Sequence, residues 1–127
     1  MQIQVSIMSE TPAYEQIRMQ IKEKILTGAL PAGTQLPSIR LMAKDLNVGI
    51  ITVKRAYEEL ENEKIIVSMQ GKGCFVNEID RDSVKKMYML ILKEQMLDIK
   101  GFSCIYGIKK SDILEIVNEL WGDEIGR

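Results

Sequence analysis

Basic side chains between residues 36 and 57 are the part of this sequence whose types and spacing best fit a chemical task. They are Arg40, Lys44, Lys54 and Arg55. Four basic residues against one acidic residue, Asp45, give this segment a charge of +3, whereas the whole chain carries −1. A local cluster of positive charge attracts the phosphates of nucleic acids. The charge distribution is therefore compatible with nucleic-acid binding, and the near-neutral total makes it weak evidence when taken alone.

Catalytic and metal-binding chemistry has few candidate residues. The chain contains no histidine, which is the commonest general base and transition-metal ligand. Its two cysteines, Cys74 and Cys104, are far apart in sequence, and we expect both to be buried and reduced rather than part of a disulfide or metal site. Four carboxylates have the spacing of a solvated helix face: Glu58, Glu59, Glu61 and Glu63. We therefore predict that the protein is not an enzyme and uses no cofactor or metal.

Length and composition favour a globular protein. A chain of 127 residues fits one domain, or a small domain with an appendage. It has no run of eighteen apolar residues, and its first ten residues lack the basic region and apolar core of a signal peptide. We expect a cytoplasmic protein with no membrane partner.

The elements that position the basic residues begin with an N-terminal strand and helix. Polar and apolar residues alternate over residues 2–6, which predicts a short strand. Thr11 is expected to cap a helix that has Pro12 at its first position and ends near Thr27. Ile17, Ile21 and Ile25 recur every four residues, so they predict a buried stripe. Gly28 is expected to end this helix.

Two further helices and a hairpin follow. Ser38 is expected to cap a helix over residues 39–46, and Asn47 can adopt the left-handed conformation of a sharp turn before a helix over 50–63. Ala43 is small where the two helices must cross, and Val53 is apolar ten residues later. Two β-rich runs, IIVSM and GCFVN, are separated by QGKG and predict a hairpin. This order is that of a winged helix-turn-helix domain.

The remaining residues predict a helical tail. A helix is expected over residues 80–100, with seven of the eight positions 84, 87, 88, 91, 92, 95, 96 and 99 apolar. Residues 101–110 are expected to form a connector, and Ser111 to cap a final helix. The apolar face of the long helix is too broad for one small core contact, so we expect it to pair two subunits. The residues predicted to dimerise are Val84, Met87, Tyr88, Ile91, Leu92, Ile113, Val117, Leu120 and Trp121.

The predicted fold class is mainly α with a small β wing. It consists of a winged helix-turn-helix domain over residues 1–77 and a two-helix C-terminal dimerisation region over residues 78–127. Two glycines flank Lys72 at the hairpin tip, where positive φ angles let backbone N–H groups approach a phosphate. No helix start follows these glycines, so a nucleotide-binding loop is a poor interpretation.

The stretches TPAYEQIRMQIKEKILTGALPAG and LPSIRLMAKDLNVGIITVKRAYEELENEKIIVSMQGKGCFV resemble the DNA-binding domain of the GntR family of bacterial transcription regulators. The short tail resembles that of the YtrA subfamily, in which two helices serve dimerisation and regulated genes often encode ABC transporters. The resemblance implies that the chain binds double-stranded DNA. The DNA-contacting residues implied are Ser38 and Arg40 before and within the first helix of the motif, Thr52 and Lys54 on the recognition helix, and Gln70, Gly71 and Lys72 at the wing tip. Helical geometry adds Arg55 to this face.

The recognition helix departs from the family pattern at its start. Gly49, Ile50 and Ile51 occupy positions where the family often has polar or basic residues, and apolar side chains form no hydrogen bonds to bases. We expect Ile50 to pack inward beside Val53, and Ile51 to point outward and contact a thymine methyl group. Lys64 replaces a usual glycine and Cys74 a usual threonine. For Tyr57 we favour a core position over a phosphate contact.

These features predict a homodimeric regulator, more specifically a repressor that binds an inverted-repeat operator. A small-molecule effector between the tail helices remains an open alternative for its control. The rival interpretation is a winged-helix module that binds proteins and does not read DNA, because the net charge is near zero and the recognition helix starts with two isoleucines.

Overall fold

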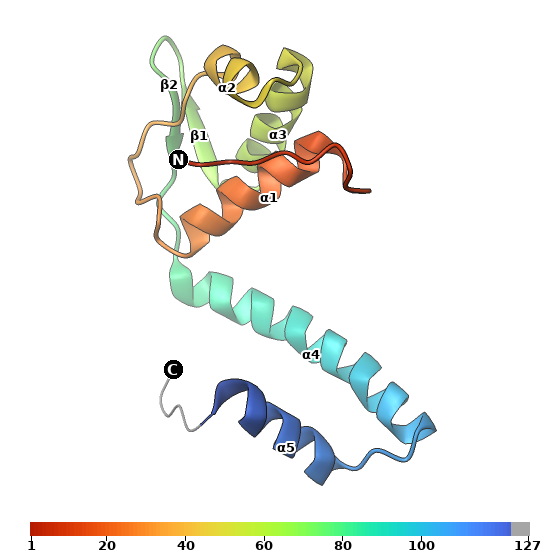
Figure 1. Ribbon diagram of the computed structural model, residues 1–127. Coiled ribbons are helices and arrows are strands. Elements are labelled where there is room, and N and C mark those ends of the chain that lie inside the picture. Colours follow the sequence, from red (N-terminus) through yellow and green to blue (C-terminus); the bar gives the residue numbers. More distant parts are fainter. Residues whose placement is uncertain (123–127) are drawn as a thin grey trace. The chain divides into compact units, whose positions relative to one another are not determined.

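The computed structural model describes residues 1–122 (Figure 1). These residues form five helices and one two-stranded antiparallel sheet, which confirms the predicted mainly α class with a β wing. The chain divides into two compact units, of which the first is Met1–Arg81 and the second begins at Asp82. Among the described residues, no helix has the length and apolar character that crossing a bilayer requires.

Helix α1, Ala13–Leu26, supplies one side of the first unit's core. Ile17 and Ile21 are fully buried and Ile25 nearly so, as the spacing of four residues predicts. Gly28 follows the helix with a φ of 85° and leads the chain away from it, as expected. The predicted cap is wrong, because the N-cap is Pro12 and no side chain caps the helix. The carbonyl of Thr11 instead accepts a hydrogen bond from the side-chain amide of Gln16.

The segment before α1 is an extended arm without strand pairing, so the predicted strand is wrong. The side-chain amide of Gln20 accepts from the N–H of Gln4 and donates to its carbonyl, at 3.0 and 2.6 Å. Gln16 holds Ser6 by the same two-bond arrangement, at 2.9 and 3.0 Å. Ile3, an apolar residue of this alternating segment, is nevertheless buried. Side-chain amides can satisfy the backbone of an extended segment that has no neighbouring strand. Such a segment shows the same alternation of polar and apolar residues as a strand, so the pattern does not distinguish the two.

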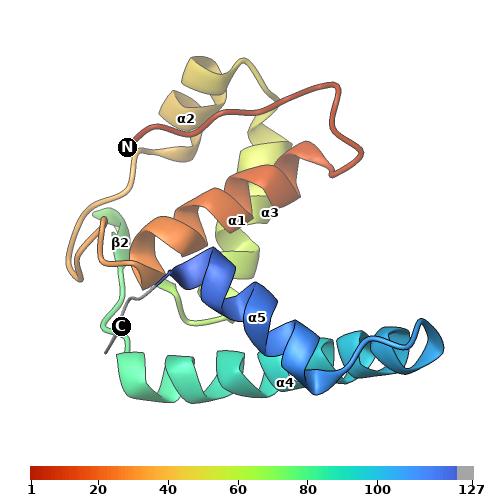
Figure 2. The ribbon, with the colours of Figure 1, turned by 60° about the horizontal axis from the view of Figure 1, so that its bottom comes forward.

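Helices α2, Ile39–Leu46, and α3, Ile50–Asn62, form the helix-turn-helix. The hydroxyl of Ser38 accepts a hydrogen bond from the N–H of Leu41 at 3.1 Å, which confirms the predicted cap. Asn47 has a φ of 55°, so the turn takes the predicted left-handed conformation. Ala43 and Val53 are both buried where the helices pack. Helix α1 packs across α3, as two views of the ribbon show (Figures 1 and 2).

Strands β1, Ile66–Met69, and β2, Gly73–Val76, form the wing hairpin. The loop after α1 borders the other side of β2. The N–H of Leu36 donates to the carbonyl of Cys74 at 2.9 Å, and the N–H of Val76 donates to the carbonyl of Thr34 at 2.8 Å. This loop therefore acts as a third, irregular strand beside the wing.

One continuous core joins these elements. Its buried members are Ile3, Ile17, Ile21, Ile25, Leu36, Met42, Ala43, Val53, Ala56, Tyr57, Leu60, Ile65, Ile66 and Val76. Cys74 is only half-buried in the wing, and Cys104 is exposed in the second unit. The expectation that both cysteines are buried is therefore wrong, because Cys104 lies on a helix that exposes most of its surface within one chain.

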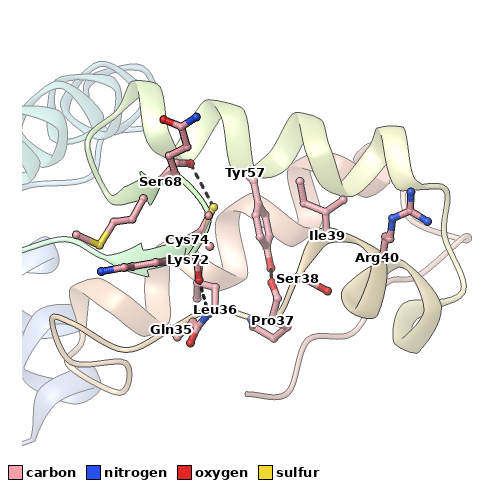
Figure 3. Close-up of a pocket in the computed structure, with 14 residues that line it drawn as sticks. Gln35, Leu36, Pro37, Ser38, Ile39, Arg40, Tyr57, Ser68, Lys72 and Cys74 are labelled. Atoms are coloured by element: carbon pink, nitrogen blue, oxygen red, sulfur yellow. Dashed lines mark hydrogen bonds between the residues drawn. The ribbon is translucent and has the colours of Figure 1, made fainter.

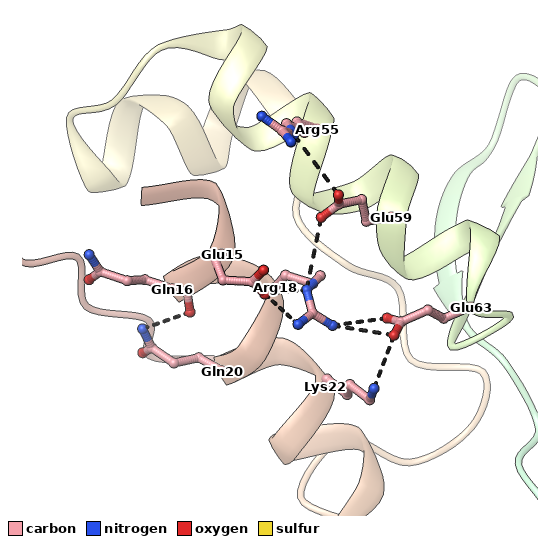
Figure 4. A network of polar contacts seen from close by, with 8 residues as sticks. All are labelled: Glu15, Gln16, Arg18, Gln20, Lys22, Arg55, Glu59 and Glu63. Atoms are coloured by element: carbon pink, nitrogen blue, oxygen red, sulfur yellow. Dashed lines mark hydrogen bonds and ion pairs between the residues drawn. The ribbon is translucent and has the colours of Figure 1, made fainter. Parts of the chain in front are cut away.

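A network of ion pairs lies outside this core, between α1 and α3 (Figure 4). Arg18 on α1 pairs with Glu15 of its own helix and with Glu63 at the end of α3, at 3.1 Å. Lys22 also contacts Glu63, at 3.0 Å. These partly exposed pairs are individually weak, but Arg18 and Lys22 share the carboxylate of Glu63, and such a network is more effective than isolated pairs.

Two helices remain: α4, Arg81–Ile105, whose residues from Asp82 onward belong to the second unit, and α5, Lys110–Trp121. The predicted connector over 101–110 is wrong in its first half, because α4 continues through Gly101 to Ile105 and the chain turns at Gly107, which has a φ of 68°. A helical glycine costs only about 1 kcal/mol, so Gly101 need not end a helix. Ser111 is not the cap. The N-cap is Lys109, whose N–H donates to the carboxylate of Asp112 at 2.9 Å.

Lys64 offers a test of the local backbone. It has a φ of 64° immediately after α3, where the N–H of Ile65 bonds to the carbonyl of Leu60 and the N–H of Lys64 to that of Glu61. This is the Schellman arrangement, which favours glycine at the left-handed position. We predict that Lys64→Gly raises the free energy of unfolding by about 0.5–1 kcal/mol, measured by urea denaturation.

The matched control for this test is Lys44→Gly, at an exposed position within α2. There the backbone is helical, so glycine should lower the free energy of unfolding by about 1 kcal/mol. Destabilisation by Lys64→Gly as well would show that the left-handed conformation carries no strain for lysine.

Candidate nucleic-acid interface

The exposed start of α3 is the first part of the candidate interface. Ile51 is 82% exposed and Ile50 is 48% exposed, while Val53 is fully buried. The expectation that Ile50 is mostly buried is therefore wrong. Side chains of a helix tilt toward its N-terminus, so Ile50 at the first helical position extends past the end of the core, although it shares a helix face with Val53. Both isoleucines consequently present apolar surface to solvent.

Thr52 and Lys54 lie on the same first two turns of α3. Thr52 is half-buried and Lys54 is exposed. The ammonium of Lys54 lies 3.9 Å from the carboxylate of Glu58 one turn later. With both side chains about 60% exposed, this contact holds Lys54 loosely and leaves it free to exchange Glu58 for a phosphate.

Arg55 is exposed on α3, as helix geometry predicts, and it also contacts two neighbouring side chains. Its guanidinium carbon lies 3.7 Å from the ring centre of Tyr14 on α1, and its Nε is 3.9 Å from the carboxylate of Glu59. Figure 4 marks the ion pair between Arg55 and Glu59 with a dashed line. A cation over an aromatic face is a favourable arrangement. Arg55 therefore links α3 to α1 in the free protein, a role that the pattern of α3 alone does not reveal.

The wing tip is the second part of the interface. Gln70, Gly71 and Lys72 are exposed, and the N–H of Lys72 donates to the carbonyl of Met69 at 2.9 Å. Gly71 has a φ of 74° in this four-residue turn, which matches the glycine position of a type II turn. Both glycines at the tip, Gly71 and Gly73, thus have the positive φ angles that their position predicts.

A groove connects the wing to the start of α2 (Figure 3). It brings together five of the predicted DNA-binding residues: Ser38, Arg40, Gln70, Gly71 and Lys72. Ile51, Thr52, Lys54 and Arg55 are not part of it and belong to the recognition helix. The predicted residues therefore form two sets, one along the groove and one on α3.

The groove wall contains two residues that hold its parts in place. The buried hydroxyl of Tyr57 on α3 donates to the carbonyl of Pro37 at 2.7 Å. The side-chain amide of Gln35 donates to the carbonyl of Lys72 at 2.8 Å. Tyr57 is a core residue, as favoured, whereas Gln35 was not singled out from the sequence. No local signal marks Gln35, because its partner lies 37 residues away.

Burial makes Tyr57 a permanent donor. Burial, and to a smaller extent the neighbouring Cys74, raise the pKa of the Tyr57 hydroxyl well above its usual value of 10. The hydroxyl therefore stays protonated throughout the physiological range and keeps its bond to Pro37.

The family described as "Bacterial regulatory proteins, gntR family" matches residues 13–76, which span α1, the helix-turn-helix and the wing. The chain belongs to the GntR family. It is therefore a DNA-binding transcription regulator and not an enzyme, which decides against the rival interpretation as a module that only binds proteins.

Full-length relatives extend the likeness to the tail. The chain is 34% identical to the HTH-type transcriptional repressor YtrA of Bacillus subtilis over 98% of this chain and 95% of the relative. A transcriptional regulator from Oenococcus oeni has a similar structure, with a TM-score of 0.74 and 33% identity over 93% of this chain and 98% of that one. YtrA from Sulfolobus acidocaldarius, a GntR-family transcription factor, gives a TM-score of 0.61 and 36% identity over 75% and 97% of the two chains. The likeness to the YtrA subfamily, expected from the tail, is confirmed.

We predict that the raised pKa of the Tyr57 hydroxyl makes the stability of the protein depend on pH. Its pKa is higher in the folded than in the unfolded chain, so its contribution is fully present below pH 10 and is lost as the pH rises above 10. For this one group the free energy of unfolding should fall by about 1.4 kcal/mol per pH unit above that point. Tyr57→Phe should remove this part of the alkaline decline, as measured by urea denaturation at several pH values.

Tyr57→Phe should also cost about 1 kcal/mol at neutral pH, because the carbonyl of Pro37 loses its partner. Tyr106→Phe removes the hydroxyl of an exposed tyrosine outside the predicted dimerisation residues, and as the control it should leave the difference between neutral and alkaline stability unchanged. Identical alkaline profiles for the wild type and Tyr57→Phe would contradict the assignment.

Proposed function

We propose that this protein is a homodimeric repressor that binds an inverted-repeat operator. The observation that carries the proposal is the pair of exposed surfaces on one small domain, the start of α3 and the wing tip with its groove. The likeness to a repressor over nearly the whole of both chains supports it. A repressor of this kind acts by occupying promoter DNA and excluding polymerase.

In this proposal α3 enters the major groove and the wing lies beside it. Thr52 and Lys54 contact the edge of the DNA major groove and the DNA backbone. The phosphates are contacted by the residues that line the groove of the protein: Ser38, Arg40, Gln70, Gly71 and Lys72. Helix widths and groove dimensions support such docking. Arg55 must give up its contact with Tyr14 before it can bind a phosphate, so we expect it to contribute less to DNA affinity than the other basic residues.

The second unit is proposed to pair two subunits. Most of the residues predicted to dimerise are well exposed within one chain: Met87, Tyr88, Ile91, Leu92, Val117, Leu120 and Trp121. Val84 and Ile113 are intermediate. Monomeric proteins seldom expose a continuous apolar patch of this extent. A second copy of the chain is the proposed occupant, because an inverted repeat requires a two-fold symmetric reader.

Regulated genes and effector are proposed from family likeness. Subfamily resemblance suggests an ABC transporter operon as the target. A small molecule that binds between the tail helices would act by changing the spacing of the two recognition helices. The promoter of the protein's own gene, searched for an inverted repeat, is the first DNA to test.

Salt dependence tests the docking surface. Lys54→Ala and Lys72→Ala should each weaken binding to all duplex DNA. Each should also reduce the slope of log affinity against log salt by about one unit, because each removes one phosphate neutralisation. Fluorescence anisotropy titrations across a salt series measure both quantities. Lys93→Ala on α4 is the matched control, and an unchanged slope in both test variants would contradict the docking face.

The two isoleucines test base reading. Ile51→Ala should lower operator affinity by about threefold to tenfold with little effect on stability, since its exposed side chain is proposed to cover a thymine methyl group. Replacing that thymine by deoxyuridine should have the same effect on the wild type and none on Ile51→Ala. Because Ile50 is half exposed, Ile50→Ala should destabilise by about 1 kcal/mol or less.

These isoleucine variants are checked by thermal melts together with binding titrations on both operators. Equal loss on deoxyuridine DNA by the wild type and Ile51→Ala would show that Ile51 does not touch the methyl group. Base reading would then have to lie with Thr52, Lys54 or the wing.

Sedimentation tests the dimer. Full-length protein at micromolar concentration should sediment as a dimer, and Ile91→Lys should produce monomers that bind operator DNA more weakly, because the second half-site is no longer held nearby. Glu94→Lys places the same charged side chain at an exposed position of the same helix and is expected to leave the dimer intact. A monomeric wild type would end the dimer proposal.

A further inference from the structure

The segment Gln35–Ser38 contacts every element that carries a predicted DNA-binding residue. At its start, Gln35 bonds to the wing tip. In its middle, Leu36 is buried and bonds to β2, and Pro37 receives the hydroxyl of Tyr57 from α3. At its end, Ser38 caps α2. Four successive residues thus connect the wing, the recognition helix and the first helix of the motif.

The contact of Gln35 with the wing is close and specific. Its Nε2 lies 2.8 Å from the carbonyl oxygen of Lys72, and a Cβ on Gly73 would lie 3.0 Å from the same Nε2. A side chain at position 73 would therefore displace the amide. Gly73 also has a φ of 111°, so the backbone conformation and the close approach both favour glycine there. Figure 3 shows this hydrogen bond beside the wing.

The wing tip needs such support. Its two strands have four residues each, and a hairpin of this size is marginally stable by itself. The residues beyond the paired strands, Gln70 to Lys72, are exposed. The bond from Gln35 fixes the backbone of Lys72 itself, which is the residue that must meet a phosphate. Ordering a contact group before binding reduces the entropy lost on binding.

We propose that Gln35 is a positioning residue that sets the wing tip relative to α2 and α3, so that Lys72 reaches DNA while the recognition helix occupies its groove. Gln35 acts through the carbonyl of Lys72 and does not itself contact DNA. The anchor on the other side is the bond from Tyr57 to Pro37, which ties the same segment to α3. This inference rests on the proposed function, in which Lys72 contacts a phosphate.

A double-mutant cycle tests the inference on the full-length protein. Gln35→Met keeps the size of the side chain and removes the donor. It should weaken operator binding by about threefold to tenfold, a loss in the range of one weakened charge-assisted contact, and leave the thermal melt unchanged because the position is exposed. In the Lys72→Ala background the same substitution should cause little further loss. In the Lys54→Ala background it should cause its full loss, because Lys54 lies on α3.

The control is Gln2→Met, the same chemical change at an exposed position outside the predicted DNA-binding residues. Normal binding by Gln35→Met, or an equal loss in both lysine backgrounds, would overturn the inference and leave the proposed function standing. If Lys72→Ala itself binds DNA as the wild type does, the wing contact of the proposed function fails, and the inference fails with it. Single-variant titrations of Lys72→Ala therefore distinguish the two failures.

Discussion

The packing of α1 against α3 fixes the orientation of the recognition helix in the first unit. Ile17 and Ile21 on α1 and Val53 and Leu60 on α3 are completely excluded from solvent. Because these side chains occupy one face of α3, the opposite face of its first turns must point outward. The position of Lys54 is thus a consequence of which residues are buried on the helix, and the exposed surface follows from the core.

The charged side chains of α3 are paired to different extents along the helix. Arg55 contacts Tyr14 and Glu59, and Glu63 contacts Arg18 and Lys22 of α1, so α3 is tied to α1 from Arg55 onward. The residues before Arg55 include the loosely paired Lys54 and no acidic residue in the first turn. A chain with a net charge near zero can therefore present positive charge at one end of one helix. Net charge alone is a poor guide to such a surface.

Local rules of sequence account for much of the fold. The stripe of isoleucines in α1, the cap at Ser38 and the left-handed Asn47 each depend on residues within one or two turns, and all are found as predicted. Features that depend on distant partners are not found this way. The arm is held by Gln16 and Gln20, and the wing tip by Gln35, through side-chain amides whose partners lie 10 to 37 residues away.

The error at Ile50 has a different cause, since periodicity places it correctly around the helix but says nothing about where the core ends along the axis. The error at Gly101 is of another kind. Glycine often follows the last residue of a helix, yet α4 continues through Gly101 to Ile105. For the candidate site, the sequence predicted the exposed residues and the buried Tyr57. It did not predict Gln35, whose hydrogen bond to the carbonyl of Lys72 holds the wing tip in place.

The left-handed residues at the two ends of α3 have a consequence for how this protein can diversify. Asn47 ends α2 just before the helix, and Lys64 ends α3 itself, each with its own turn of backbone hydrogen bonds. Between these two fixed points an inserted or deleted residue would rotate the remaining helix by about 100° and turn buried residues to solvent. Insertions and deletions within α3 are therefore expected to be tolerated poorly. A change in which DNA the helix binds is therefore expected to come from substitutions of its exposed side chains at constant helix length.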